Sequence, residues 1–175
     1  MRKTLPLVVK GALIFVVAAV LLWVSIIGPI LHKSDVIATP IPLVSGETLD
    51  LRTLRGHVVV LNFWAPDCPS CVEELPALEN LYNKYQSRGL VIIGITIPTA
   101  SVPKSLALAA MAKVTYPLAA DRDGAISRAV GGVMVTPTQV IINKAGKVID
   151  KYQGVITDPE PMGDILGALM HTKGK

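Results

Sequence analysis

The sequence predicts an α/β fold in which a central mixed β-sheet is flanked by helices and preceded by a β-hairpin and a transmembrane helix. Two continuous apolar runs, residues 57–63 and 90–97, are typical of strands buried on both faces. A helical pattern over residues 69–88 joins them into a strand–helix–strand unit, which makes the two strands parallel. A 21-residue stretch without charge, residues 11–31, precedes the domain.

Residues 11–31 have the dimensions of a membrane span. As a helix they would be about 31 Å long, which matches the apolar core of a bilayer. Arg2, Lys3 and Lys10 come first, so we expect the N-terminus in the cytoplasm and the domain across the membrane. A cleaved signal peptide is the alternative, but the run is long and the small-residue site at 36–38 is poor. The prediction is an uncleaved anchor within residues 1–33, a linker over 34–40 and one domain over 41–175.

Charge and cysteine content exclude two classes of protein. Four of the seventeen basic residues precede Ser34, which leaves thirteen basic and thirteen acidic residues after it. The net charge of +4 therefore belongs to the N-terminal segment, and a neutral domain does not bind nucleic acid through its phosphates. Two cysteines are too few to hold together a disulfide-rich scaffold of this size.

The remaining elements are expected in order along the domain. Residues 41–44 and 48–51 flank a turn sequence and indicate a hairpin, and residues 54–56 indicate one helical turn. The helix over 69–88 ends at Gly89. After the strand at 90–97, we expect short helices at 103–113 and 124–130 and a second hairpin at 138–143 and 147–153. A last helix is expected at 158–170, with Pro159 and Pro161 in its first turn.

Both cysteines lie in one octet between the first buried strand and the following helix, Trp64-Ala65-Pro66-Asp67-Cys68-Pro69-Ser70-Cys71. The backbone N–H groups and dipole of the helix N-terminus favour the thiolate of Cys68, which makes it the attacking thiol. Pro69 fits the first helical position. Cys71 lies one turn further along and is expected to be the shielded, resolving thiol. This spacing therefore predicts redox chemistry.

Two other uses of a cysteine pair at this spacing are weaker. A static disulfide across two residues adds little stability, because the closed loop is short. Half of a zinc site would need a second Cys or His pair, and His32, His57 and His171 are scattered along the chain.

Around these cysteines the sequence resembles the thioredoxin superfamily, and most of all its membrane-anchored, extracytoplasmic TlpA/ResA-like branch, which includes reductases of cytochrome c maturation. The resemblance covers the chain from Ile41 onward. The residues that carry it are Leu61-Asn62-Phe63-Trp64-Ala65, Cys68-Pro69-Ser70-Cys71, Glu74, Pro76, Val135-Thr136-Pro137-Thr138 and residues 140–148. It implies a thioredoxin-like fold.

The resemblance also implies roles for residues outside the cysteine pair. Thr136-Pro137 looks like the family's cis-proline pair, which packs against the cysteines, and the backbone of Thr136 would dock an extended substrate segment. Glu74 is implied as a partly buried acid that tunes or deprotonates the thiols. Trp64 is expected to cover the active site and take part in docking, with a core aromatic as the alternative.

Two residues depart from the general thioredoxin pattern. Asn62 stands where general thioredoxins keep a buried aspartate, so proton transfer would fall to Glu74 or to water. Asp67 places a carboxylate beside Cys68, which opposes the effect of the helix dipole on the thiolate and favours a reductase. The alternative is that Asp67 is simply an exposed N-cap residue.

The expected function is a membrane-tethered thiol–disulfide oxidoreductase that reduces protein disulfides on the periplasmic or outer side of the membrane. A transmembrane thiol protein is the expected electron donor, and the branch implies apocytochrome c and copper-site assembly proteins as substrates. A disulfide oxidase or isomerase of secreted proteins and a Cu(I)-handling protein stay open as alternatives. No cofactor, resident metal or nucleic acid is expected, since two thiols complete the cycle alone.

Overall fold

The computed structural model describes residues 38–155 and 159–170, together with Val16, Val17 and Leu22. The chain divides into two units, Met1–Ser34 and Asp35–Lys175, and the second carries the fold. Among the described residues, no helix is long and apolar enough to cross a bilayer. The expected anchor over residues 11–31 lies outside the described residues, apart from the three N-terminal ones named above.

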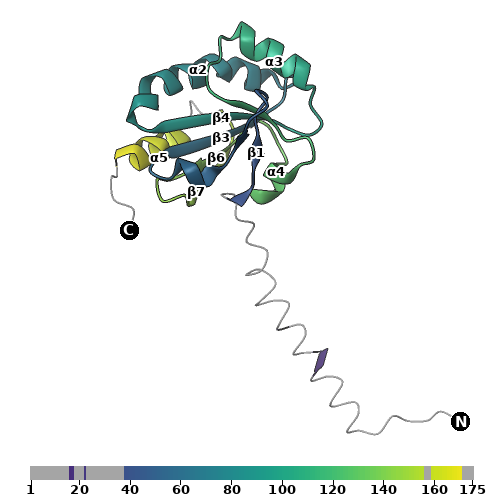
Figure 1. The fold of residues 1–175 in the computed structure, drawn as a ribbon, viewed down its shortest axis with the longest axis vertical. Helices are drawn as coiled ribbons and strands as arrows, with labels where there is room; N and C mark the ends of the chain where they lie inside the picture. The colour runs from purple at the N-terminus through teal and green to yellow at the C-terminus, as the bar shows by residue number, and fades with distance from the viewer. Residues whose placement is uncertain (1–15, 18–21, 23–37, 156–158, 171–175) are drawn as a thin grey trace, which may run out of the picture. The chain divides into compact units, whose positions relative to one another are not determined.

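A five-stranded sheet forms the centre of the domain (Figure 1), with the strand order β5-β4-β3-β6-β7. Its strands are β3 (Val58–Trp64), β4 (Leu90–Thr96), β5 (Leu118–Ala120), β6 (Thr138–Ile142) and β7 (Val148–Gln153). The central strand β3 pairs in parallel with β4 and antiparallel with β6. The predicted mixed sheet is thus confirmed, and the parallel strands β3, β4 and β5 end at the same edge.

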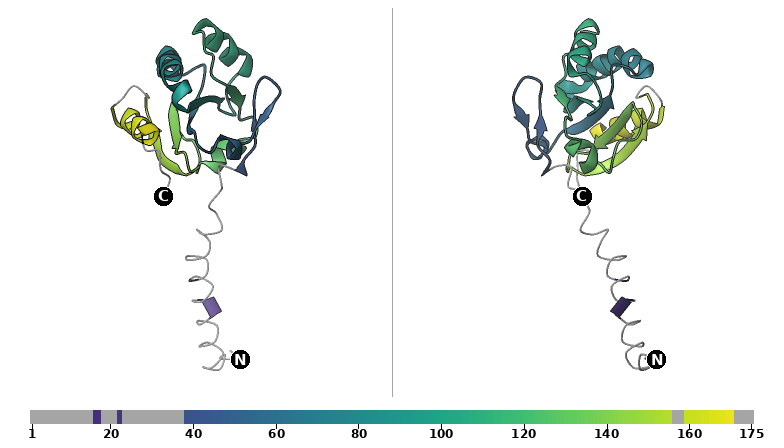
Figure 2. Two further views of the ribbon diagram at one scale, coloured as in Figure 1. Left: turned by 60° about the vertical axis from the view of Figure 1, so that its left-hand side comes forward. Right: turned by 90° about the vertical axis from the view of Figure 1, so that its right-hand side faces the viewer.

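Helices and the N-terminal hairpin cover the two faces of the sheet (Figure 2). On one face, α2 (Pro69–Tyr85) and α5 (Pro159–Met170) pack against alternate residues of β3 and β4, including Val60 and Ile92. On the other face, Phe63 and Ile95 pack with the hairpin strand β1 (Ile41–Pro42), the 3-10 helix η2 (Leu51–Leu54) and α4 (Ala125–Ala129). Complete burial of β3 explains its unbroken apolar sequence.

The hairpin is joined to the edge of the sheet. Its strands β1 and β2 (Thr48–Leu49) pair with each other in register Ile41 to Leu49. The following residues reach β5, where Leu43 bridges Ala119 and the backbone N–H of Val44 donates to the carbonyl oxygen of Leu118 at 2.9 Å.

Some boundaries differ from the sequence prediction. The hairpin strands are two residues each, because the chain leaves the pairing early to reach β5. The helical turn lies at η2, before the predicted position, because Asp50 caps it through the backbone N–H of Arg52. The helix α2 ends at Tyr85 and continues as the 3-10 helix η3 (Gln86–Arg88). Strand β5 was not predicted, and α3 spans Val102–Met111.

Candidate active site

The two cysteines lie where β3 ends and α2 begins, as the sequence predicts. Cys68 is the N-cap of α2 and Pro69 occupies its first turn. The two sulfurs form a disulfide, and the backbone N–H of Cys71 donates to Cys68 Sγ at 3.3 Å. The hydroxyl of Ser70 lies 3.4 Å from the same sulfur. Polar hydrogens at the positive end of a helix therefore converge on Cys68 Sγ, where they favour a thiolate when the bond opens.

The two sulfurs differ in access. Cys71 is fully buried and packs with Trp64, Leu75 and Ala109, whereas Cys68 is half-buried at the edge of the same cluster. A partner molecule can therefore reach Cys68 but not Cys71. This asymmetry fits an attacking and a resolving thiol.

The segment before β6 lies against the reactive sulfur. The Thr136–Pro137 peptide bond is cis, as the resemblance implies, and the carbonyl oxygen of Thr136 lies 3.5 Å from Cys68 Sγ. The hydroxyl of Thr138 donates to the carbonyl oxygen of Val135 at 2.7 Å. Met134 and Val135 are 87% and 50% exposed. Chain segments 68 residues apart thus meet at one sulfur.

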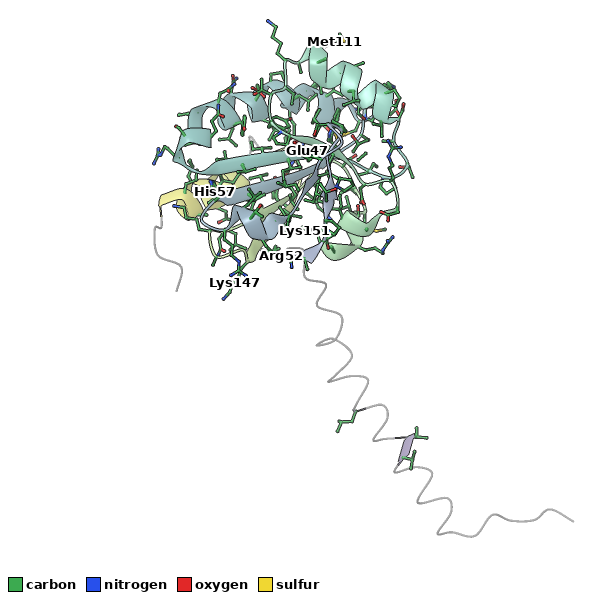
Figure 3. All side chains as sticks on the ribbon, in the orientation of Figure 1. Glu47, Arg52, His57, Met111, Lys147 and Lys151 are labelled. Carbon is green, nitrogen blue, oxygen red and sulfur yellow. A yellow bond between two sulfur atoms is a disulfide. The ribbon has the colours of Figure 1, made fainter. Side chains whose placement is uncertain are left out.

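A lysine on β7 holds the turn that leads into this segment. Lys151, labelled in Figure 3, donates from Nζ to the carbonyl oxygen of Val130 at 3.2 Å and to that of Gly132. Both carbonyls lie beyond Ala129, the last residue of α4, so Lys151 fixes the turn that follows this helix. Nothing in the local sequence indicated this contact.

Trp64 does not cover the active site. Its side chain has no exposed surface and lies in the core, against Cys71, Leu75 and Ala109. A fully buried ring cannot contact a docked segment, so the alternative of a core aromatic is correct. Trp64 points to the same face of the sheet as Val60, because residues two apart on a strand share a face.

Glu74 lies three residues after Cys71 on α2 and is more deeply buried than the sequence suggested, at 2% exposed. Its Oε1 accepts a hydrogen bond from Gln139 Nε2 at 3.3 Å, and the same nitrogen donates to Asn62 Oδ1 at 3.2 Å. Asn62 and Gln139 are fully buried. Sequence reasoning identified Glu74 and Asn62 but missed Gln139, whose only signal was a polar residue inside an apolar strand.

Asp67 forms an ion pair that the sequence did not reveal. Lys104, near the N-terminus of α3, bonds the Oδ1 atom of Asp67 through Nζ. The cation belongs to a helix 37 residues further along the chain. The carboxylate beside Cys68 is therefore paired with a positive charge.

A metal site and a small-molecule cavity are the alternatives to a redox site. In the described part of the chain, no three His, Cys, Asp or Glu side chains gather where they could hold a metal ion. A cavity of about 740 Å³ lies between the hairpin, α3 and the start of α4, and neither cysteine lines it. The disulfide and its surroundings are therefore the candidate site.

Comparisons with known proteins agree with this geometry. The model of the Redoxin family matches residues 37–166. The thiol-disulfide oxidoreductase ResA of Halalkalibacterium halodurans is 31% identical over 115 residues, which are 65% of this chain and 63% of that protein. The thioredoxin-like protein YneN of Bacillus subtilis is 33% identical over 117 residues, 66% of this chain and 68% of that protein. The chain thus spans less than two thirds of the first relative.

A solved structure has the same fold. A thiol:disulfide interchange protein of the thioredoxin family from Chlorobium tepidum superimposes with a TM-score of 0.65 at 25% identity, over 75% of this chain and 97% of that one. The domain therefore has a thioredoxin-like fold.

Proposed function

Because the chain belongs to the Redoxin family, we propose that it is a thiol–disulfide oxidoreductase that reduces disulfides in protein substrates. The observation that carries this proposal is the unequal cysteine pair at the N-terminus of α2, with Cys68 accessible and Cys71 buried. The name of its ResA relative, a thiol-disulfide oxidoreductase, supports the same reaction.

The reaction proceeds in two exchanges. In the reduced protein, the thiolate of Cys68 attacks one sulfur of a substrate disulfide, and that bond breaks to release one substrate thiolate, which takes a proton from water. The thiolate of Cys71 then attacks Cys68 Sγ, which releases the second substrate thiolate and forms the Cys68–Cys71 disulfide. Two electrons pass from the protein to the substrate, and a thiol donor must return them.

The second exchange needs a proton acceptor. Cys71 is fully buried among apolar side chains, and burial disfavours a thiolate. Glu74 lies one helical turn further along α2 and is itself buried. We assign to Glu74 the role of base that takes the proton of Cys71 as Cys71 attacks.

The substrate segment would dock beside Cys68. The carbonyl oxygen of Thr136 lies next to Cys68 Sγ, and the exposed side chains of Met134 and Val135 flank it. An extended peptide could pair with the backbone of Thr136, next to Pro137, while its cysteine reaches Cys68.

The setting we propose is the outer side of a membrane, with residues 11–31 as an uncleaved anchor. Tethering would raise the effective concentration of the domain toward substrates held at the same surface. A transmembrane thiol protein is the proposed donor, and apocytochrome c or copper-site assembly proteins are the proposed substrates. The uncharged segment and the basic residues before it support this part.

A redox titration of the full chain against glutathione or dithiothreitol tests the direction of the reaction. A potential near about −270 mV or lower is expected for a reductase, and one near about −120 mV would identify an oxidant instead. Tight Cu(I) binding by the reduced protein, without turnover of protein disulfides, would favour copper handling.

Replacement of the resolving thiol tests the assignment of the two cysteines. The Cys71→Ser variant should accumulate a mixed disulfide through Cys68, and its partner can be identified by mass spectrometry. The matched Cys68→Ser variant should trap nothing. Equal trapping by both variants would contradict the assigned roles.

A further inference from the structure

Beneath the redox helix, polar side chains occupy a row that crosses the sheet. Asn62 on β3 lies opposite Gln139 on β6 in register. Leu61 and Phe63 point into the core on the other face, so Asn62 and Gln139 point toward α2. Glu74 meets them from that helix. Three buried polar side chains from three elements therefore share one hydrogen-bonded group.

The hydrogen bonds of this group use both N–H bonds of one amide. Gln139 Nε2 donates to Asn62 Oδ1 at 3.2 Å and to Glu74 Oε1 at 3.3 Å. Two buried atoms, Asn62 Nδ2 and Gln139 Oε1, have no hydrogen-bond partner among the described residues. This arrangement suits Glu74 as a carboxylate, because both bonds at Gln139 Nε2 need an acceptor.

A second arrangement uses the same positions. If both amides turn by half a rotation, oxygen and nitrogen exchange places with little movement of heavy atoms. Gln139 Oε1 then accepts one bond from Asn62 Nδ2 and one from the O–H of a protonated Glu74. The number of hydrogen bonds is the same in both arrangements. The two amides can therefore form hydrogen bonds with Glu74 both when it is charged and when it is neutral.

We propose that Gln139 and Asn62 are positioning residues that hold Glu74 in both protonation states, by reversing their amides when the proton of Cys71 arrives and leaves. This rests on the proposed function, in which Glu74 is the base for Cys71. The proton leaves Cys71 Sγ for a carboxylate oxygen of Glu74, and the electron pair left on sulfur forms the new bond to Cys68 Sγ. When a donor reduces the disulfide, the proton returns to Cys71.

Tyr116, a titratable side chain that interacts electrostatically with Glu74, does not compete for this proton. Tyr116 lies in the segment before β5. Its burial, and to a smaller extent the negative charges of Glu74 and Glu79, raise the pKa of this tyrosine above its usual value. Tyr116 thus stays neutral at working pH. The sheet contributes Asn62 and Gln139, which do not titrate, and α2 contributes Cys71.

NMR of the full chain tests the amide reversal without any substitution. Side-chain amide signals of Asn62 and Gln139 and the carboxyl carbon signal of Glu74 are followed against pH, in the oxidised and reduced protein. We expect all three to change with one midpoint, and the amide changes to vanish in Glu74→Gln. Titration of Glu74 without any response of the two amides would overturn the proposal.

Kinetics of the resolving step give a second test. The Gln139→Met variant removes the donor to Glu74, and Gln153→Met, at an exposed position on β7, is the matched control. The bond that Gln139 donates to the charged carboxylate is stronger than the bond it accepts from the neutral acid, so loss of Gln139 should move the pH midpoint of mixed-disulfide release upward. The rate at neutral pH should fall about tenfold or more. Attack by Cys68 should be unchanged, and in the Glu74→Gln background Gln139→Met should have no further effect.

The two tests separate this proposal from the proposed function. Wild-type protein that exchanges no protein disulfides would contradict the function, while the NMR titration would still decide whether the amides follow Glu74. Normal exchange by wild type, with identical pH profiles for Gln139→Met and Gln153→Met, would overturn the positioning role alone. If Gln139→Met does not fold, the NMR result on the unsubstituted chain decides the question.

Discussion

The ion pair beside Cys68 is the residue-scale feature that acts most directly on the reactive sulfur. Asp67 alone would repel a thiolate at the next residue. Lys104 bonds its carboxylate, and the side chains of Asp67 and Lys104 are 70% and 52% exposed, respectively. The positive charge of Lys104 weakens the repulsion between Asp67 and the Cys68 thiolate. We therefore expect the helix N-terminus to stabilise this thiolate more than Asp67 destabilises it.

Removal of the lysine tests this balance. We expect Lys104→Gln to move the midpoint of Cys68 alkylation against pH upward, because Asp67 then disfavours the thiolate unopposed. The shift should be less than about one pH unit, since both charges face water. Asp67→Asn should move the midpoint downward, and rates of iodoacetamide alkylation measure both. An unchanged midpoint in Lys104→Gln would show that the pair does not influence Cys68.

Site residues with a local motif, or with a match in the resemblance, could be predicted from the sequence. Residues that reach the site from distant parts of the chain could not. Cys68, Cys71 and Pro137 belong to recognisable motifs. Lys104 and Gln139 reach the site from 37 and 65 residues beyond their partners, and no spacing rule connects such positions. The surface placement of Trp64 was wrong because every residue of β3 is buried, so its sequence does not distinguish the faces.

At the scale of elements, β4 depends on a glycine at its centre. A Cβ at Gly94 would lie 2.8 Å from Leu118 Cδ2 and 3.1 Å from Tyr116 Cε2. Gly94 is opposite Asn62 in register, on the face that α2 covers. Neighbouring side chains therefore fill the space that a larger residue would need.

We expect Gly94→Ala to lower the free energy of unfolding by about 1–3 kcal/mol, because the core must shift to admit the methyl group. Gly167→Ala in α5 is the control, since nothing outside the local helix backbone lies within 4 Å of the added Cβ. There the free energy should be unchanged or raised by up to about 1 kcal/mol. Urea unfolding measures both free energies, provided that their dependence on urea concentration has the same slope in each variant. An equal loss of stability in the two variants would contradict the packing argument.

The contact between β7 and the turn after α4 should affect binding more than chemistry. Lys151→Met keeps the apolar stem but removes the bonds to Val130 and Gly132 that fix the approach to Thr136. KM for a protein disulfide should rise about three- to tenfold, whereas reduction by dithiothreitol should be unchanged. Steady-state kinetics measure the difference, with the exposed Lys147→Met as control. A similar loss in both reactions would indicate general destabilisation.

The length of an element decided how well it was predicted. Seven-residue buried strands such as β3 and β4 have a nearly continuous apolar pattern, which is easily recognised in the sequence. Strand β5 has three residues, too few for any periodicity. Its position depends on pairing with β4, which is a long-range contact and not a property of its own sequence.

At the scale of the whole molecule, the redox state and the stability of the fold are linked. If the folded protein is a reductase, oxidation is more favourable in the folded than in the unfolded chain, so the disulfide form must be the more stable one. Each 30 mV by which the reduction potential of the folded chain lies below that of the unfolded chain stabilises the oxidised fold by about 1.4 kcal/mol relative to the reduced fold.

We therefore expect the oxidised chain to unfold at a higher urea concentration than the reduced chain. Urea unfolding of both forms, monitored by far-ultraviolet circular dichroism, measures this difference. A more stable reduced form would indicate an oxidant and would contradict the proposed direction of the reaction.

Much of the architecture could be predicted from the order of its patterns. A strand, a helix and a strand, followed by a hairpin and a helix, define a mixed sheet when connections are short and right-handed. The approach of Pro137 to Cys68 could not be derived in this way, because it depends on β6 pairing antiparallel with β3. That placement came from the resemblance.

The N-terminal hairpin has a further consequence, for solubility. Through Leu43 and Val44 it occupies backbone groups of β5, the outermost strand on that side of the sheet. An uncovered outer strand offers its free N–H and C=O groups to other chains and promotes aggregation. A chain that lacks the hairpin and begins after it would keep both cysteines. Its strand β5 would then have free backbone groups that can pair with a strand of another molecule. The hairpin, which contributes no residue to the disulfide site, thereby protects the protein from self-association.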